Sequence, residues 1–338
     1  MRASRSSSPD TTVASSSARA HGAAPRASVR DVRLGVIDIG SNTVHLAVVD
    51  AVRGARPVPA ASQRTVVRLM RFLDDDGSIS TDGVAALTDA VTVAAAAALD
   101  HEVDETIAIA TSALREATNG PEVLAVLEGI IGAPLQVLSG ESEARLTFLA
   151  VRRWYGWGAG RLLVLDIGGG SLEIAAGTDE EPEVAMSLPL GAGRLTRAHL
   201  RHDPPQADEM SELRDVVQRE LDAAKRAFAD QPAPDHVVVT SKTFRSLARL
   251  AGGEVDVVGP ADAWRMRRSD LKDWVGRLAA IPAEQRQSLP GVTAERTHQI
   301  VAGAVVAHQA MKALGIDEVE VCPWALREGV LLRRLDQL

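Results

Sequence analysis

Two segments of the chain place an aspartate directly before a turn of small residues, and the two segments resemble each other. Residues 34–48 read LGVIDIGSNTVHLAV, and residues 162–176 read LLVLDIGGGSLEIAA, so that Asp38 matches Asp166. A carboxylate beside hydroxyl groups and turn amides can hold a hard cation such as Mg²⁺ against an anion. The repeated pattern therefore predicts a phosphate-binding loop in each half of the chain.

Each copy predicts two strands joined by a tight turn. The glycines at 168–170 permit backbone angles that turn successive N–H groups toward an anion. Asp38 and Asp166 are expected to hold the metal ion. A single turn of this kind is usually only structural, whereas two in register favour a phosphate clamp. The turn residues expected to bind phosphate are Gly40, Ser41, Asn42, Thr43, Gly168, Gly169, Gly170 and Ser171.

The composition is that of a folded protein whose ligand is not nucleic acid. Apolar residues make up 46% and charged residues 24% of the 338 residues, which is enough chain for two domains. The net charge of −8 argues against nonspecific nucleic-acid binding, because that binding requires a broad basic face. No apolar run is as long as a membrane span. We therefore expect neither nucleic acid nor a membrane as partner.

The first 31 residues differ from the rest, since residues 1–30 hold five arginines against one aspartate among many Ser and Ala residues. They lack the apolar segment of a signal peptide, so we expect a disordered tail over 1–31. Cys322 is the only cysteine, which rules out an intrachain disulfide and favours the cytoplasm. Before Pro323, this thiol is expected to be a buried packing residue rather than a nucleophile.

Strands alternate with helices along the chain, which predicts an α/β protein with mixed sheets. The predicted strands are a hairpin over 34–50, then 64–69, 106–110, 135–138, 162–167, 171–176, 183–187, 236–240 and 318–321. The predicted helices are 81–99, 120–131, 142–154, 207–229, 241–251, 268–278, 293–314 and 324–335. The periodic pattern breaks near 150–160, so we predict domains over 32–152 and 153–338, and we leave open that the last helix packs back on the first domain.

Further motifs narrow the class of protein. They are ATSALREATN (110–119), LSGESEARLTF (138–148), DIGGGSLE (166–173) and ALREGVLL (325–332). With the two loops, these motifs resemble the exopolyphosphatase and guanosine pentaphosphate phosphohydrolase (Ppx/GppA) family of the actin, sugar kinase and Hsp70 superfamily. The segments TSKTFRSLARLAG (240–252) and CPWALREG (322–329) resemble its short actinobacterial branch. The resemblance implies two ribonuclease H-like α/β domains with a cleft between them.

The resemblance also implies a reaction and a catalytic glutamate. The family removes the terminal phosphoryl group from inorganic polyphosphate or from pppGpp, and its glutamate motif falls here on Gly140, Glu143 and Arg145. A carboxylate can orient an in-line water and accept its proton. Glu143 stands at the start of a helix, whose dipole is expected to keep the carboxylate ionised. The alternative is an ordinary solvated glutamate, such as we expect Glu141 to be.

Other roles follow from the resemblance with open alternatives. Arg115 is expected to act in catalysis or else to pair with Glu116, and Arg145 and Lys242 are expected to bind phosphate or else to be solvated. Glu173 is expected to join Asp166 as a metal or water ligand.

One position differs between the two copies of the repeat, and one differs from the family pattern. Glu173 matches His45 in the internal repeat, so the two hairpins are not equivalent. His298 stands where many members have Asp in an Arg-Ala-Asp motif, and its role and that of Arg327 stay open.

The leading hypothesis is an exopolyphosphatase that uses Mg²⁺ or Mn²⁺ and prefers short polyphosphates, and a homodimer is the default assembly. A pppGpp 5′-phosphohydrolase of the stringent response is the alternative. The phosphate loops alone would also serve an ATPase or kinase, but that interpretation leaves Glu143 unexplained. A non-catalytic sensor of (p)ppGpp or polyphosphate would lack a catalytic group, whereas Asp38, Glu143, Asp166 and Glu173 are all present.

Overall fold

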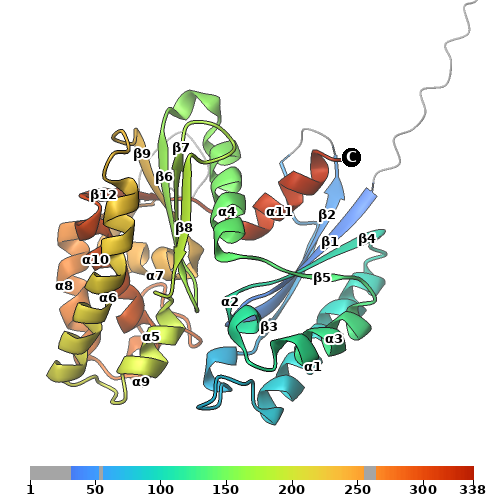
Figure 1. Ribbon diagram of the computed structural model, residues 1–338, viewed down its shortest axis with the longest axis horizontal. Helices are drawn as coiled ribbons and strands as arrows, with labels where there is room; N and C mark the ends of the chain where they lie inside the picture. Colours follow the sequence, from blue (N-terminus) through green and yellow to red (C-terminus); the bar gives the residue numbers. More distant parts are fainter. Residues whose placement is uncertain (1–31, 53–55, 255–263) are drawn as a thin grey trace, which may run out of the picture. The chain divides into compact units, whose positions relative to one another are not determined.

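The computed structural model describes residues 32–52, 56–254 and 264–338. Residues 32–338 form one compact unit in which strands and helices alternate and the strands make two mixed sheets (Figure 1). The predicted tail, residues 1–31, lies outside the described residues. The predicted α/β class with mixed sheets is confirmed, while a domain boundary at 152/153 stays a prediction.

The first sheet has the strand order β3-β2-β1-β4-β5. Strands β2 and β3 run antiparallel to their neighbours, and β4 and β5 run parallel to β1. Helices α1 and α3 pack on one face of this sheet through buried residues such as Leu87, Val91 and Leu127. The strands are β1 (Val32–Ile39), β2 (Thr43–Ala51), β3 (Ala61–Val66), β4 (Glu105–Ala110) and β5 (Leu135–Val137). The helices are η1 (Leu69–Arg71), α1 (Thr81–Asp100), α2 (Ser112–Glu116) and α3 (Gly120–Ile131).

The second sheet repeats this plan and extends it, in the order β10-β11-β12-β9-β6-β7-β8. Read from β8 to β12, its five strands have the same order and relative directions as the first sheet. The strands are β6 (Leu162–Ile167), β7 (Leu172–Gly177), β8 (Val184–Leu188), β9 (His236–Thr240), β10 (Gly252–Glu254), β11 (Trp264–Arg267) and β12 (Glu318–Val321). The helices are η2 (Trp157–Ala159), α5 (Ala192–His199), α6 (Ala207–Phe228), α7 (Ser241–Ala251), α8 (Arg268–Ala280), α9 (Ala283–Arg286) and α10 (Ile300–Ala313).

The repeated hairpins have the same register. Asp38 pairs with His45 across β1 and β2, and Asp166 pairs with Glu173 across β6 and β7. Each turn is closed by the same hydrogen bond. The Gly40 N–H donates to the Thr43 carbonyl at 3.0 Å, and the Gly168 N–H donates to the Ser171 carbonyl at 2.9 Å. The sequence repeat is therefore a structural repeat, and both aspartates stand at the same point of their hairpins.

Helix α4 (Gly140–Tyr155) contacts both sheets, and α11 (Leu326–Leu335) follows it on the first sheet. Phe148 and Val151 of α4 pack on the second sheet, whereas Leu146 joins Leu331 of α11 in a cluster on the first sheet. The two helices approach so closely that a Cβ on Gly329 would lie 2.0 Å from the Leu146 carbonyl oxygen. Helix α4 therefore places its first turn where both sheets can contribute side chains.

Two expectations are corrected by the structure. Helix α10 begins at Ile300, and residues 293–299 form turns in which Arg296 N–H donates to the Thr293 carbonyl at 2.8 Å. Within the described part of the chain, one helix, α1, is long and apolar enough to cross a membrane, contrary to the expectation that no segment is. It packs on β2, β3 and α3 as a core helix of its sheet.

Candidate functional site

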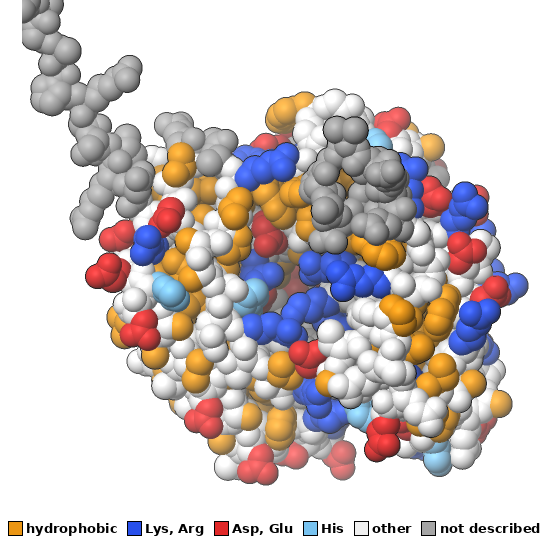
Figure 2. All heavy atoms as spheres, turned by 180° about the vertical axis from the view of Figure 1, so that it is seen from behind, with side chains coloured by type: hydrophobic (Ala, Val, Ile, Leu, Met, Phe, Trp, Pro, Cys, Tyr) orange, Lys and Arg blue, Asp and Glu red, His pale blue; other side chains and the backbone are white. Residues whose placement is uncertain are grey.

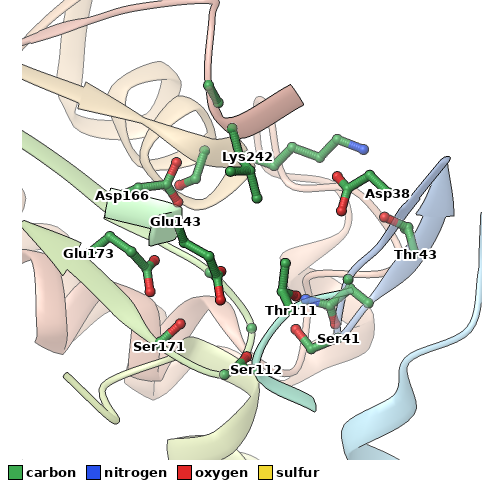
Figure 3. Close-up of a pocket in the computed structure, with 18 of the residues that line it drawn as sticks. Asp38, Ser41, Thr43, Thr111, Ser112, Glu143, Asp166, Ser171, Glu173 and Lys242 are labelled. Atoms are coloured by element: carbon green, nitrogen blue, oxygen red, sulfur yellow. The ribbon is translucent and has the colours of Figure 1, made fainter. Parts of the chain in front are cut away.

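A cavity of ≈ 180 Å³ lies where the two hairpin turns meet. Figure 3 shows Glu143, Asp166 and Glu173 on one side of the cavity and Asp38 with Thr43 on the other, with their polar groups turned inward. It is lined by Asp38, Gly40, Ser41, Asn42, Thr43, His45, Thr111, Ser112, Glu143, Thr147, Asp166, Gly168, Gly169, Gly170, Ser171, Glu173, Ser241, Lys242, Arg245, Arg296, Ala325, Leu326 and Arg327.

The glycines of the second turn are required by close contact. A Cβ on Gly169 would lie 2.0 Å from Ser41 Oγ, and a Cβ on Gly170 would lie 2.1 Å from Ser112 Oγ. Neither glycine is among the described residues with positive φ, so these two residues do not adopt the left-handed angles that glycine permits. Their missing side chains instead let the second turn approach the first turn and the start of α2.

Glu143 lies in the first turn of α4, and its side chain is turned into the cavity. The helix is capped by Ser139, whose Oγ accepts from the Ser142 N–H at 3.1 Å. Glu143 is 6% exposed, and Arg115 Nη1 donates to its Oε1 at 2.5 Å. Arg115 also donates to the Leu138 carbonyl at 2.5 Å, so the guanidinium is fixed behind the carboxylate. Arg115 therefore positions Glu143 and is not part of the cavity lining.

The charge on Glu143 differs from the sequence expectation. Burial raises its pKa to about 7, the hydrogen bond and charge of Arg115 oppose this, and the charges of Asp38 and Asp166 add to it. Burial therefore acts against the helix dipole, which was expected to keep this carboxylate ionised. A carboxyl that titrates near neutral pH can accept a proton at physiological pH.

Glu173 stands beside Glu143 as a second buried carboxyl. Its pKa is raised well above the ordinary value by burial, and further by the charge of Glu143. Ser187 Oγ donates to Glu173 Oε1 at 2.9 Å. The second hairpin and α4 thus place two carboxyl groups together whose charges repel.

Asp38 and Asp166 approach the cavity from the two hairpins. Burial raises the pKa of Asp38 to about 6, with Arg327 opposing and with Asp166 among the charges that add to it. Burial also raises the pKa of Asp166, opposed by the hydrogen bond from Thr240 Oγ1. Both raised pKa values indicate that the positive groups nearby do not fully compensate the negative charges of the two aspartates.

The carboxylate oxygens of these two aspartates are suitable ligands for a magnesium or manganese ion. Over the residues that the structure describes, no three His, Cys, Asp or Glu side chains come together as a metal-binding group. Mg²⁺ in phosphate sites usually takes one or two carboxylates, with phosphate oxygens and waters completing the shell. Asp38 and Asp166 could supply those carboxylates.

Part of the cavity lining is basic. Lys242, Arg245 and Arg296 line the cavity, and Arg64 lies close enough to lower the pKa values of Lys242 and Arg296. Burial, followed by the charges of Arg64 and Arg296, lowers the pKa of Lys242 to about 8. Figure 2 shows Lys and Arg side chains gathered around a hollow on one face, although the net charge of the chain is −8.

Comparison with known proteins decides the family. The model of the Ppx/GppA phosphatase family matches residues 47–338. The chain belongs to this family.

The relatives of the chain in this family include proteins of known name and structure. Exopolyphosphatase 1 of Mycobacterium tuberculosis is 50% identical over 305 residues, which are 90% of this chain and 89% of that protein. Guanosine-5′-triphosphate,3′-diphosphate pyrophosphatase of Aeromonas salmonicida is 28% identical over 87% of this chain and 58% of its own length. The crystal structure of an exopolyphosphatase from Cytophaga hutchinsonii matches with a TM-score of 0.80 at 25% identity, over 90% of this chain and 98% of that one. The predicted family and fold class are thereby confirmed.

Most predicted site residues of this family member line one cavity, and two, Arg115 and Arg145, do not. Arg145 pairs with Glu141 at 2.7 Å and reaches Glu181 at 3.5 Å, so it lies outside the cavity. His298 lines a neighbouring cavity instead. Cys322 is buried, and burial raises the pKa of its thiol, as expected of a packing residue.

Several cavity residues were missed or left open by the sequence. Thr111 and Ser112 lie in the motif ATSALREATN (110–119), in which only Arg115 was predicted to be a site residue. Arg245 lies three residues after Lys242 on the same helix, a spacing that places both on one side and could have indicated it. Ser241 has a left-handed backbone (φ 73), an uncommon conformation that is frequent at functional sites.

Proposed function

We propose that this protein is an exopolyphosphatase that hydrolyses the terminal phosphoryl group of inorganic polyphosphate, with short chains preferred. The position of Glu143 carries the proposal. This carboxyl lies between two phosphate-type turns, is held by Arg115 and has a pKa raised to about 7. A mycobacterial relative of 50% identity named Exopolyphosphatase 1 supports polyphosphate over pppGpp, whose named hydrolase is 28% identical.

In this proposal the chain binds a terminal phosphate between the two turns. The turn amides and the hydroxyls of Ser41, Thr43 and Ser171 contact its oxygens, and Lys242 with Arg245 binds the phosphates that follow. Glu143 orients a water in line with the leaving oxygen and accepts its proton. Arg115 keeps Glu143 in place and favours its ionised form.

Asp38 and Asp166 would hold the Mg²⁺ or Mn²⁺ ion, with Glu173 as a further ligand or as a partner of the water. When bound, the ion supplies positive charge that offsets both the carboxylates and the phosphate oxygens. The basic wall supplies the rest of the compensation, which matters in a chain with a net charge of −8.

The remaining partner assignments follow from the proposed substrate. Polyphosphate or pppGpp is the ligand, nucleic acid and membranes are not, the protein acts in the cytoplasm, and two copies form a homodimer. If pppGpp proves to be the substrate, the same residues would serve and the protein would belong to the stringent response.

The test is phosphate release from polyphosphates of defined length, pppGpp and ATP, with Mg²⁺, with Mn²⁺ and with EDTA. We expect release from short polyphosphates that EDTA abolishes and that E143Q lowers by about 10²- to 10⁴-fold. E141Q is the matched control, because Glu141 occupies the same helical turn but is exposed and paired with Arg145. Equal rates for E143Q and E141Q would contradict the mechanism, and release from ATP alone would favour the ATPase alternative.

A further inference from the structure

A second cavity, of ≈ 230 Å³, lies beside the phosphate cavity and has a basic lining. Arg68, Arg71, Arg197 and His298 line it. In the described segments none of these four side chains forms an ion pair with a carboxylate, whereas Arg64, Arg115 and Arg194 nearby do. The cavity therefore gathers positive charge that the protein leaves uncompensated.

The contacts that these side chains do make are to backbone carbonyls. Arg68 Nη2 donates to the Ala294 carbonyl at 3.1 Å, and Arg68 Nε is buried without a partner. Arg197 Nη2 donates to the carbonyls of Leu73 and Asp74 at 2.7 Å and 3.2 Å. Carbonyl groups orient a guanidinium group but do not neutralise it, so the charges remain available to an anion.

The charges in this cavity also repel one another. Burial lowers the pKa of Arg71, and the charge of Arg68 lowers it further. Burial likewise lowers the pKa of His298, followed by the charge of Arg71. The one carboxylate in the lining, that of Glu295, is paired with Arg64 at 3.2 Å. A bound anion would relieve this repulsion.

The cavity is attached to the first phosphate turn. Asn42 lines both cavities, and Gln299 Nε2 donates to Asn42 Oδ1 at 3.4 Å. The N–H groups of Val67 and Arg68 donate to the Asn42 carbonyl at 2.9 Å and 3.0 Å. A ligand on Arg68 therefore acts on the same residue that contacts the substrate in the phosphate cavity.

We propose that this second cavity binds a phosphate group outside the reaction centre. Guanidinium groups match phosphate oxygens in geometry and charge. Met70 and Leu200 add apolar surface to the wall, and the arginines are the permanently charged groups in it that have no carboxylate partner. The phosphate comes either from a later position in a polyphosphate chain whose end lies in the first cavity or from a separate orthophosphate ion.

Direct binding to the full chain tests the site itself. Calorimetry with orthophosphate and with long polyphosphate, in the E143Q background so that no substrate is consumed, compares R71Q and R71Q/H298Q with R219Q. Arg71 and Arg219 are both exposed, and Arg219 lies on α6, so each variant is expected to fold. We expect R71Q to weaken binding of at least one ligand by about tenfold, as for loss of one hydrogen bond to a charged group. Affinities equal to those of R219Q for both ligands would overturn the proposal.

Kinetics then separate the two sources of phosphate, and this arm alone rests on the proposed exopolyphosphatase activity. If the chain itself reaches the cavity, R71Q raises KM for long polyphosphate and leaves KM for tripolyphosphate unchanged. If orthophosphate binds there, added phosphate changes the wild-type rate at every chain length and changes the R71Q rate less. A wild-type protein that releases no phosphate would refute the proposed function, while the binding measurement would still decide the second cavity.

Discussion

Replacing Glu143 by glutamine is expected to stabilise the metal-free protein while it abolishes activity. Glu143 is 6% exposed, and burial, opposed by Arg115 and reinforced by Asp38 and Asp166, raises its pKa from 4.5 to about 7. The folded state holds the proton of Glu143 more tightly than the unfolded state does. The free-energy cost of ionising Glu143 in the folded protein is therefore absent below about pH 4.5, grows between about pH 4.5 and 7 and is complete above pH 7. The difference corresponds to roughly 3 kcal/mol at pH 8.

Glutamine keeps the shape of Glu143 and still offers an oxygen to Arg115 Nη1, so the substitution removes the charge and keeps the contact. In EDTA at pH 8 we expect Tm to rise by on the order of 5 °C. At pH 5 the rise should shrink to about a quarter, because the carboxyl is protonated in the folded state but still largely ionised in the unfolded state. Phosphate release with Mg²⁺ should fall by about 10²- to 10⁴-fold at pH 8 and by less at pH 5, where the wild-type carboxyl is itself protonated and cannot accept the proton of the water.

Thermal unfolding followed by circular dichroism at both pH values provides the measurement. E141Q should change Tm little, because the Glu141 side chain is 58% exposed. A Tm for E143Q below that of the wild type at pH 8, or the same rise at pH 5 and pH 8, would refute the reasoning that electrostatic strain is stored at Glu143. Such a conflict between stability and activity is common at active sites.

Four other substitutions test single contacts. R115M removes the hydrogen bond that favours ionised Glu143, so the acid limb of the pH profile of kcat/KM should move to higher pH. Activity should therefore fall more at pH 6.5 than at pH 8.5. An acid limb at the wild-type pH would contradict the positioning role of Arg115. G169A places a Cβ 2.0 Å from Ser41 Oγ and should lower kcat/KM by about 10²-fold, and wild-type kinetics would show that the turns need not touch. K242M should raise KM by about tenfold below pH 8, where Lys242 is protonated, and the difference should fade above pH 8; a difference independent of pH would point to a role other than charge. R145Q should stay within about twofold of wild-type activity, and a large loss would return Arg145 to the site.

The strands and helices of this fold could be predicted where the local hydrophobic pattern and the turn residues indicate the same element. Strands 162–167, 236–240 and 318–321 and helices 120–131 and 241–251 have the predicted bounds. The repeat also predicted the equivalence of Asp38 and Asp166, because a hairpin register depends on nearby residues. Short elements such as α2, α5 and α9 were missed, since four to eight residues carry too little periodicity.

The cavity itself needed the tertiary structure. Arg296 reaches it because residues 293–299 form turns instead of the predicted helix, and its Nη1 donates to Thr243 Oγ1 at 2.9 Å. The raised pKa of Glu143 depends on burial by both sheets, which no local pattern reports. Arg145 was misplaced for a related reason, since two residues along a helix correspond to nearly opposite faces.

The mismatch between the two hairpins suggests a division of labour. At the first hairpin Arg327 Nη1 donates to His45 Nε2 at 3.1 Å, and its Nε lies 3.8 Å from Asp38 Oδ2. An arginine can only donate, so His45 Nε2 is the acceptor in this contact. The first hairpin thus has a guanidinium beside its aspartate, although burial still raises the pKa of Asp38 to about 6. At the second hairpin Glu173 replaces the histidine and stands beside Asp166 and Glu143, so carboxyl groups accumulate there with raised pKa values. We infer that both hairpins share the phosphate and the cation through Asp38 and Asp166, and that the second hairpin in addition supports the attacking water, because Glu173 and Glu143 stand there.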